Sequence, residues 1–302
     1  MAAGQPIAPN SPQKWCDGTV TENPTDPETL RAAAQQLATE AADFVRRRRP
    51  EVFGVAGSSE AAPGGPDAIR SKSTPTDPVT IVDTETERLL RDRLAELRPG
   101  EPVLGEEGGG AFASEPGQPT WVLDPIDGTV NFVYGIAAYA VSVGVQIDGE
   151  SVAGAVANVP LEVVYSAARG HGAHIWQDGR FSALRCSGTT DLSMALVATG
   201  FAYVAERRAR QAEILAGLLP VVRDIRRFGS CALDLCMVAA GQLDAYYEDG
   251  VHVWDWAAAA LIATEAGAQV LLPGTEGPGL VVAGSPGVSD ALRAELGRLN
   301  AL

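Results

Sequence analysis

The chain has 302 residues, 46% of them hydrophobic and 20% charged, a composition typical of a globular protein with one large domain or two moderate ones. Its 23 Lys and Arg residues against 38 Asp and Glu residues give a net charge of −15, which argues against a protein that binds nucleic acid or an anionic membrane through a basic surface. An anionic substrate would need a positive group in such a chain, and a divalent cation is the natural candidate.

The N-terminus and the cysteines indicate where the protein works. The first residues have neither the basic start nor the apolar core of a secretory leader, and no stretch approaches the roughly 18 apolar residues of a membrane span. Without a Cys-x-x-Cys pair, the cysteines suit reduced thiols better than a disulfide framework; they are Cys16, Cys186, Cys231 and Cys236. We therefore expect a cytoplasmic protein that does not bind a membrane.

Two helices are predicted near the N-terminus. Residues 1–24, rich in Pro, Gly, Asn, Ser and Thr, are expected to form a flexible extension. Residues 25–28 provide a capping box, and apolar residues at helical spacing extend the first helix to Arg46–Arg49, before Pro50. The arginine run is expected to be a solvated helix end. A second helix is predicted at 84–97.

The rest of the chain shows two patterns. A short buried strand at 121–123 is followed, from Tyr139, by apolar runs that alternate with turn residues, which is typical of an antiparallel meander. After residue 184, strands and helices alternate as in a layered α/β unit. The strands are expected at 195–199, 243–248 and 279–283, and the helices at 208–219, 230–240, 254–266 and 289–299. The sequence therefore predicts an α+β half at 25–183 and an α/β half at 184–302.

The segment from Asp124 to Thr129 carries the most chemical information. Asp124 and Asp127 follow a buried strand, Pro125 fixes the backbone between them, and Gly128 permits a tight turn. The amides of Gly128 and Thr129 would begin a helix and offer an anion site. Two carboxylates beside an anion site make electrostatic sense when a cation lies between them. A capped turn explains the same residues equally well, because Asp, Pro and Gly are all common in turns.

Three further segments contain acidic residues in suggestive surroundings. Glu106 and Glu107 stand in a glycine-rich loop, where adjacent glutamates are usually just solvated. Asp255 lies between two tryptophans, where a partly buried carboxylate needs a partner, although it could also cap the helix that follows. Asp83 comes after a polar loop that begins at Lys72, and it could equally be a helix cap.

Together these segments resemble the inositol monophosphatase family of metal-dependent phosphatases, over nearly the whole chain from about residue 26. The family's first signature is similar to residues 121–132, WVLDPIDGTVNF, and its second to residues 246–255, YYEDGVHVWD. The Gly-Glu-Glu corner at 105–107 and the segment at 72–83 stand in the family's order. The details are most similar to the bacterial SuhB-type branch.

The resemblance implies a fold, a cofactor and a set of metal ligands. The fold is a layered αβαβα sandwich with the site between the two halves. Glu106, Asp124 and the Ile126 carbonyl would bind a first Mg²⁺. The second would be bound by Asp124, Asp127 and Asp255, and a third, weaker ion would depend on Glu106 and water. Carboxylate, carbonyl and water oxygens are the ligands that suit Mg²⁺.

The resemblance also implies roles in catalysis. Thr129 and Asp83 would orient the attacking water and help to deprotonate it, and the amides of Gly128 and Thr129 would hold the phosphate. Glu106 completes the catalytic set. The attack by metal-activated water would proceed without a covalent phosphoenzyme. Lys72 lies on a loop that is mobile in relatives and would help to close the site.

The residues that would contact the substrate come from both halves. This set comprises Asp127, Gly128, Thr129, Cys231, Glu248 and Asp255. Relatives often have alanine where this chain has Cys231, so the wall departs from the family pattern there, and we favour a packed thiol over a redox-active one. Arg226 and Arg227 are expected to be surface residues or part of a dimer contact, although they could also steer an anionic substrate.

One function is preferred and two alternatives remain. The preferred function is Mg²⁺-dependent hydrolysis of inositol 1-phosphate to inositol and phosphate, because Glu248 and the two tyrosines before it resemble the inositol branch. The first alternative is the same chemistry on fructose 1,6-bisphosphate, histidinol phosphate or 3′-phosphoadenosine 5′-phosphate. The second is a binding partner of the transcription machinery, as some SuhB-type relatives are. The resemblance further implies a lithium-sensitive homodimer with a small anionic phosphate ester as substrate and no direct contact with nucleic acid.

Overall fold

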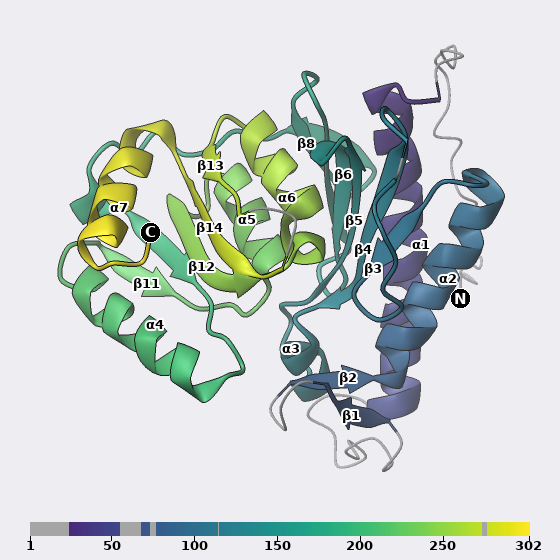
Figure 1. Ribbon diagram of the computed structural model, residues 1–302, viewed down its shortest axis with the longest axis horizontal. Helices are drawn as coiled ribbons and strands as arrows, with labels where there is room; N and C mark the ends of the chain where they lie inside the picture. Colours follow the sequence, from purple (N-terminus) through teal and green to yellow (C-terminus); the bar gives the residue numbers. More distant parts are fainter. Residues whose placement is uncertain (1–23, 55–67, 73–76, 114, 274–276) are drawn as a thin grey trace, which may run out of the picture.

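Helices and sheets alternate in layers, and the predicted αβαβα sandwich is confirmed (Figure 1). The protein is seen as a computed structural model that describes residues 24–54, 68–72, 77–113, 115–273 and 277–302. Within these ranges, every helix is too short or too polar to cross a lipid bilayer.

The larger sheet has seven strands in the order β3-β4-β5-β6-β7-β8-β9. Its strands are β3 (Val103–Gly105), β4 (Pro119–Asp127), β5 (Ala140–Ile147), β6 (Glu150–Asn158), β7 (Val163–Ala168), β8 (Ala173–Gln177) and β9 (Arg180–Ala183). β3 and β4 pair in parallel, and each later pair is antiparallel. The meander predicted from Tyr139 onward is therefore confirmed.

The smaller sheet has five strands in the order β11-β10-β12-β14-β13. Its strands are β10 (Leu196–Thr199), β11 (Asp224–Arg226), β12 (Ala245–Val251), β13 (Gln269–Leu271) and β14 (Gly279–Gly284). β10 runs parallel to both β11 and β12, whereas β14 is antiparallel to β12 and β13. The short strands β11 and β13 were not predicted from the sequence.

The helices form three layers around these sheets (Figure 1). α1 (Pro27–Phe53) and α2 (Ile81–Leu97) cover the outer face of the larger sheet. α5 (Cys231–Ala239) and α6 (Val253–Glu265) fill the space between the two sheets. α4 (Ala205–Leu218) and α7 (Pro286–Arg298) cover the outer face of the smaller sheet. The remaining elements are the hairpin of β1 (Ile69–Ser71) and β2 (Pro78–Thr80), the short helix α3 (Thr129–Tyr134) and a 3₁₀ turn at Leu192–Met194.

Strand periodicity distributes the core over both faces of the larger sheet. Trp121 and Leu123 point into the apolar layer beneath α1 and α2, whereas Val122 joins the layer beneath α5 and α6. Gly144 and Gly154 let α6 approach the sheet closely, since a Cβ at either position would come within 3.0 Å of atoms of Ala257 or Ala258. This close packing sets the position of α6 relative to the sheet. The first turn of α6 carries Asp255, one of the candidate metal ligands.

The first helix departs from the prediction at its C-terminal end. α1 does not stop before Pro50 but continues through it to Phe53, and the amide of Gly54 closes the last turn on the Pro50 carbonyl at 3.0 Å. The expectation of a solvated arginine end is also wrong for Arg49, which is only 9% exposed. Its guanidinium donates to the carbonyls of Phe132, at 2.9 Å, and Val133, at 3.4 Å. Arg49 therefore ties α1 to the C-terminal end of α3, where the carbonyls of the last turn can accept from groups outside the helix.

The structure does not test two predictions about domain organisation. The flexible extension at 1–24 lies outside the described residues apart from Pro24. The boundary between residues 183 and 184 stays a prediction, although the strands of the larger sheet end at Ala183 and those of the smaller sheet begin at Leu196.

We expect Arg49→Met to destabilise the protein by about 2 kcal/mol, because methionine keeps the aliphatic stem but leaves the buried Phe132 carbonyl of α3 without its charged donor. Urea unfolding would measure the change in the free energy of unfolding. Arg47→Met is the matched control, since Arg47 is exposed on the same turn of α1 and should shift stability by no more than about 0.5 kcal/mol. Equal stability of the two variants would contradict the structural role of Arg49.

Candidate active site

A cavity of about 620 Å³ lies between the ends of the two sheets and collects most of the predicted site residues. Its walls come from the end of β4, the beginnings of α3, α5 and α6, and the middle of β12. The predicted residues among its lining are Lys72, Glu106, Asp124, Ile126, Asp127, Gly128, Thr129, Cys231, Glu248 and Asp255. Asp83 is fully buried and lies directly behind Thr129.

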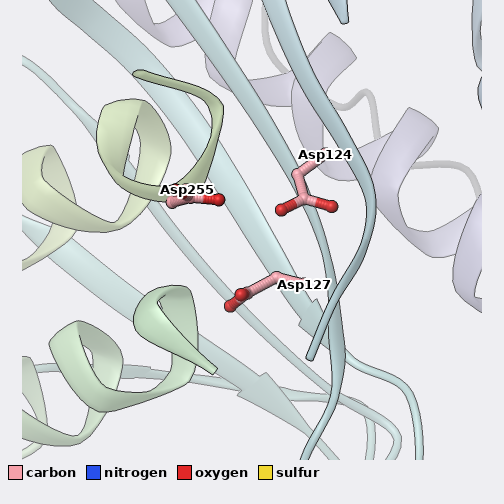
Figure 2. Close-up of side chains that lie close together, drawn as sticks. All are labelled: Asp124, Asp127 and Asp255. Carbon is pink, nitrogen blue, oxygen red and sulfur yellow. The ribbon is translucent and has the colours of Figure 1, made fainter. Parts of the chain in front are cut away.

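Three aspartates form the acidic cluster of this cavity. Each of Asp124, Asp127 and Asp255 offers a carboxylate oxygen, and these atoms all lie within 4.8 Å of one another. Figure 2 shows the three side chains pointing toward a common space, Asp124 and Asp127 from the end of β4 and Asp255 from the start of α6. Residues 124 and 255 are far apart in the sequence, so the two halves must pack correctly for the cluster to exist.

Backbone amides hold each carboxylate in place. Asp124 accepts from the amide of Ile126 at 3.0 Å, where a bulge interrupts the pairing of β4 with β5. Asp127 accepts from the Ser230 hydroxyl and from the amide of Ala232 at 2.7 Å, in the first turn of α5. Asp255 accepts from the amide of His252 at 2.6 Å and so caps α6. The capping role that the sequence left open for Asp255 is therefore real, and it coexists with membership of the cluster.

Burial and mutual repulsion make the ionised cluster unfavourable without a counter-charge. Burial raises the pKa of Asp124 and of Asp255 well above the ordinary value, and the neighbouring carboxylates of Glu106 and Asp127 add to the effect. Burial also raises the pKa of Asp127, to about 6, although the hydrogen bonds that it accepts from Ser230 and Ala232 oppose the shift.

The donor set fits a hard divalent cation. Among the described residues, no Lys or Arg forms an ion pair with Asp124, Asp127 or Asp255; Lys72 and Arg207, which also line the cavity, pair with other acidic groups. Carboxylates and a backbone carbonyl are oxygen ligands of the kind that Mg²⁺ and similar ions take. The acidic cluster could therefore hold a metal ion, and a bound cation would remove the repulsion that burial creates.

Glu106 reaches the cavity from a turn that follows β3. Its amide donates to the Leu123 carbonyl at 3.1 Å, which anchors the turn to β4. Its carboxylate accepts from the Lys72 ammonium at 2.8 Å, and Glu107 pairs with the same ammonium. Burial alone would lower the pKa of Lys72, but these two carboxylates outweigh it and raise the pKa. Lys72 thus contacts one predicted ligand, while the next four residues of its loop lie outside the described chain.

Asp83 and Thr129 meet at the junction of two helix N-termini. α2 begins at Ile81, earlier than predicted, because Thr80 and Asp83 form a reciprocal capping box. The second oxygen of Asp83 accepts from the Thr129 hydroxyl at 3.1 Å. Burial raises the pKa of Asp83 to about 7, with the Thr80 hydrogen bonds opposing the shift. Asp83 is therefore a helix cap that also contacts a residue of the cavity wall, and its role in catalysis stays a prediction.

Gly128 is required by its surroundings. It adopts a φ of 93°, and a Cβ there would lie 2.9 Å from the Ala138 carbonyl oxygen and 3.1 Å from that of Gly229. The chain can therefore turn from β4 into α3 at this point only without a side chain. This turn places the start of α3 at the cavity, since Gly128 and Thr129 both belong to its lining.

The wall opposite the acidic cluster comes from the second half of the chain. Glu248 accepts from the Tyr246 hydroxyl at 2.8 Å, and its carboxylate lies flat against Gly200, where a Cβ would be 1.9 Å from Oε2. Burial raises the pKa of Glu248 to about 7, although the bond from Tyr246 opposes the shift. Cys231 is only 5% exposed, and burial raises the pKa of its thiol well above the ordinary value. A protonated, enclosed thiol agrees with the preferred interpretation of a packed cysteine.

Several cavity residues escaped the sequence analysis. Tyr203 contributes to the wall from the segment that leads into α4, and Arg207 contributes from the first turn of α4. The rings of His252 and Trp254 stack 4.7 Å apart at the start of α6. No local motif marks Tyr203 or Arg207, because only the packing of α4 brings them to the cavity. His252 is the exception, because the sequence suggests a structural or substrate-adjacent residue rather than a metal ligand; it lines the cavity, and its role stays a prediction.

The two arginines before the turn at 229–232 separate in the structure. Arg226 pairs with Asp224 on the surface, as expected for a solvated residue. Arg227 is exposed too, so the expectation of a surface residue is confirmed for it, and it also lines the cavity, where it could steer an anionic substrate. Its guanidinium lies against the Cα of Gly229, where a Cβ would come 2.3 Å from Nη1. This places a positive group at the cavity of an acidic protein.

Comparison with known proteins gives a consistent result. The profile of the inositol monophosphatase family matches residues 26–301. A curated relative named inositol-1-monophosphatase, from Mycobacterium leprae, is 65% identical over 291 residues, which cover 94% of this chain and 98% of the relative. The solved structure of Mycobacterium tuberculosis SuhB has 56% sequence identity and a TM-score of 0.77, covering 92% of this chain and 99% of its own. A more distant relative, from Pasteurella multocida, is named Nus factor SuhB and is 38% identical over 200 residues, 66% of this chain and 73% of the relative.

In metal-free buffer, we expect the protein to melt several degrees higher at pH 5.5 than at pH 8. The folded state holds protons on Asp124, Asp127 and Asp255 up to a higher pH than the unfolded chain does, because their pKa values are raised. These groups therefore stabilise the folded state fully below their pKa in the unfolded chain, which is about 4. This stabilisation is lost as the pH rises through their pKa values in the folded state. Differential scanning calorimetry in the presence of a chelator would measure the shift.

Asp124→Asn should reduce this pH dependence and raise the melting temperature at pH 8, since it removes one buried charge and keeps the acceptor for the Ile126 amide. Asp290→Asn is the control for overall charge repulsion, because Asp290 is exposed on α7 and its change should leave the pH dependence intact. If both variants behave like the wild type, the cluster is not the source of the effect.

Proposed function

The chain belongs to the inositol monophosphatase family and is a phosphatase enzyme, and we propose that it hydrolyses inositol 1-phosphate in a reaction that depends on Mg²⁺. The observation that supports this most strongly is the cluster of Asp124, Asp127 and Asp255, three carboxylates within 4.8 Å in a cavity large enough for a small phosphate ester. A cluster of this kind is electrostatically reasonable when it serves a cation.

The family's metal arrangement can be assigned to residues that this structure brings to one cavity. Glu106, Asp124 and the Ile126 carbonyl would hold one Mg²⁺, and Asp124, Asp127 and Asp255 would hold another. When bound, Mg²⁺ supplies Lewis-acid stabilisation of the developing negative charges and lowers the pKa of water. Asp124 belongs to both sets, so its carboxylate would serve both ions, and it is almost fully buried.

Thr129 and Asp83 are proposed to prepare the attacking water. The Thr129 hydroxyl lies in the cavity and donates to Asp83, so it can accept a hydrogen bond from water while passing its own proton toward the carboxylate. A general base acts best when its pKa is near the working pH, and burial places that of Asp83 at about 7. The amides of Gly128 and Thr129 would hold the phosphate oxygens across the same turn.

The residues of the substrate wall favour a polyol as the leaving group. Glu248 is fixed by the Tyr246 hydroxyl and by contact with Gly200, and a fixed carboxylate accepts hydrogen bonds from substrate hydroxyls. Arg207 and Arg227 also line the cavity, so a second phosphate would find positive groups there. Fructose 1,6-bisphosphate, histidinol phosphate and 3′-phosphoadenosine 5′-phosphate therefore remain alternative substrates for the same cation-binding residues.

A role in transcription is a second candidate function. The observation that favours it is the relative from Pasteurella multocida whose name is Nus factor SuhB. The −15 net charge argues against direct binding of nucleic acid but leaves a contact with another protein open. A pull-down of RNA polymerase components that survives Asp127→Asn would support this candidate independently of catalysis.

We further propose that the enzyme works in the cytoplasm as a homodimer and is inhibited by lithium, as the family resemblance implies. Cys186, Cys231 and Cys236 are free thiols in the structure, which suits a reducing compartment. Light scattering of the purified protein would give the number of subunits, and a titration with lithium chloride would test the inhibition.

Asp127→Asn should lower Mg²⁺-dependent phosphate release from inositol 1-phosphate by at least about a hundredfold, because it removes one charge from the cluster that would hold the cation. The fold should survive, since asparagine can still accept from the Ala232 amide. The measurement is inorganic phosphate release, with and without Mg²⁺, on inositol 1-phosphate and the three alternative esters. Wild-type turnover by the variant would refute the metal assignment, and preference for another ester would refute the substrate but keep the chemistry.

Glu248→Gln should raise the KM for inositol 1-phosphate about tenfold with little change in kcat, because a hydrogen bond to a charged acceptor is worth roughly 1.5–3 kcal/mol and serves substrate binding. The matched control is a substrate, p-nitrophenyl phosphate, which has no hydroxyls for Glu248 to bind. Its KM should be the same for both proteins. An equal loss on both esters would mean that Glu248 supports the site as a whole and does not recognise a polyol.

A further inference from the structure

The turn that carries Glu106 is held from behind by Glu87, a residue of α2 outside the cavity lining. The Glu87 side chain is almost fully buried and accepts from the amide of Glu107 at 2.7 Å and from the amide of Gly108 at 2.9 Å. It also accepts from the Arg91 guanidinium at 2.8 Å. Its two oxygens thus serve consecutive amides of the turn, an arrangement that only a carboxylate can satisfy without turning a donor toward another donor.

Arg91 completes the attachment. It lies one turn after Glu87 on the same face of α2, and its guanidinium donates to the Gly109 carbonyl at 2.6 Å. The same carbonyl accepts from the amide of Gly105 at 3.0 Å, which closes the turn into a small loop. Glu87 and Arg91 together therefore attach three consecutive residues of the turn, 107–109, to α2.

The glycines of the turn match this attachment. A Cβ at Gly105 would lie 2.4 Å from Oε1 of Glu87, and a Cβ at Gly108 would lie 2.6 Å from the same atom. Neither residue has a positive φ, so the backbone there is accessible to any amino acid. A side chain at Gly105 or Gly108 would therefore collide with the Glu87 carboxylate. The two glycines allow this close approach and are not needed for a special backbone conformation.

One face of α2 therefore serves two parts of the site. Asp83 and Glu87 are separated by four residues, so they point in the same direction from the helix. Asp83 binds the Thr129 hydroxyl, and Glu87 binds the turn of Glu106. α2 is a rigid element packed on the larger sheet, so both groups are placed relative to Asp124 by the same helix.

We propose that Glu87 is a positioning residue that holds Glu106 toward Asp124 and thereby sets the affinity of the acidic cluster for its divalent cation. This inference rests on the proposed role of Glu106 as a ligand. Glu87 does not line the cavity, so its effect must pass through the turn. Partners that orient metal ligands in this way typically change metal affinity by about 10–100-fold when they are removed.

The test compares Glu87→Gln with the wild type in two measurements. Glutamine has one acceptor oxygen and an NH₂ group that would face an amide donor, so the turn should lose one of its anchors. We expect the dissociation constant for Mn²⁺, measured by electron paramagnetic resonance on the substrate-free protein, to rise at least about tenfold. The Mg²⁺ concentration for half-maximal phosphate release should rise in parallel, while kcat at saturating Mg²⁺ stays within about threefold.

Two further variants make the result specific. Glu96→Gln removes a carboxylate from the exposed part of the same helix and should leave both constants unchanged. Gly108→Ala keeps Glu87 but displaces its carboxylate, and Gly108 is itself exposed, so the variant should fold and weaken Mn²⁺ binding in the same direction. It also replaces Glu87→Gln as the test if that variant does not fold.

The outcomes separate this inference from the proposed function. If the wild type binds Mn²⁺ and releases phosphate but Glu87→Gln and Gly108→Ala keep wild-type constants, the positioning role is wrong and the phosphatase assignment stands. If the variants lose kcat at saturating Mg²⁺ with an unchanged Mn²⁺ constant, Glu87 acts on something other than the cation site, and the inference is again wrong. If the wild type neither binds Mn²⁺ nor releases phosphate, the proposed function itself fails.

Discussion

The structure depends most on holding several carboxylates together in a buried space. Asp124, Asp127 and Asp255 meet within 4.8 Å in a chain whose net charge is already −15. Helix N-termini offset part of the repulsion: Asp255 caps α6, and Asp127 accepts from the first turn of α5. Their partial positive charges act over one helical turn, which is too little to neutralise three ionised groups. The remaining imbalance is the physical reason for a cation, and it explains why so many element ends point at one cavity.

Packing between the halves sets the geometry of this cluster. Asp124 is fixed by β4, whereas Asp255 is fixed by the start of α6, so their separation depends on how closely α6 lies on the larger sheet. Gly144 and Gly154 remove the side chains that would hold the helix away, and the alanines of α6 fill the contact. Small residues in the middle layer thus have a direct consequence at the site, although none of them touches the cavity. A methyl group added there would move a candidate ligand by moving a whole helix.

Sequence reasoning succeeded where chemistry is concentrated in short segments. The segment from Asp124 to Thr129 stood out because a strand end, a fixed proline and a glycine turn are local properties, although a capped turn explained it equally well and the ligand roles came only from the family resemblance. It failed where a role is decided by distant packing: Arg49 was expected to be solvated but binds α3, and Tyr203 and Arg207 reach the cavity without any local signal. Glu87 passed unnoticed because a glutamate on a helix normally indicates a solvated face. Strands of three residues, such as β11 and β13, are too short to show an alternating pattern.

The two halves contribute differently to the proposed reaction. The residues assigned to the cation and the attacking water come from the first half, except for Asp255, whereas Glu248, Tyr203, Arg207 and Arg227 form the opposite wall from the second half. Substitutions in that wall can change which ester fits without altering the acidic cluster, since the contacts that hold the cluster do not involve those four side chains. Family membership therefore constrains the chemistry more tightly than the substrate. The fixed carboxylate of Glu248 favours a polyol and the two arginines favour a second anionic group, so the balance between these groups decides the specificity.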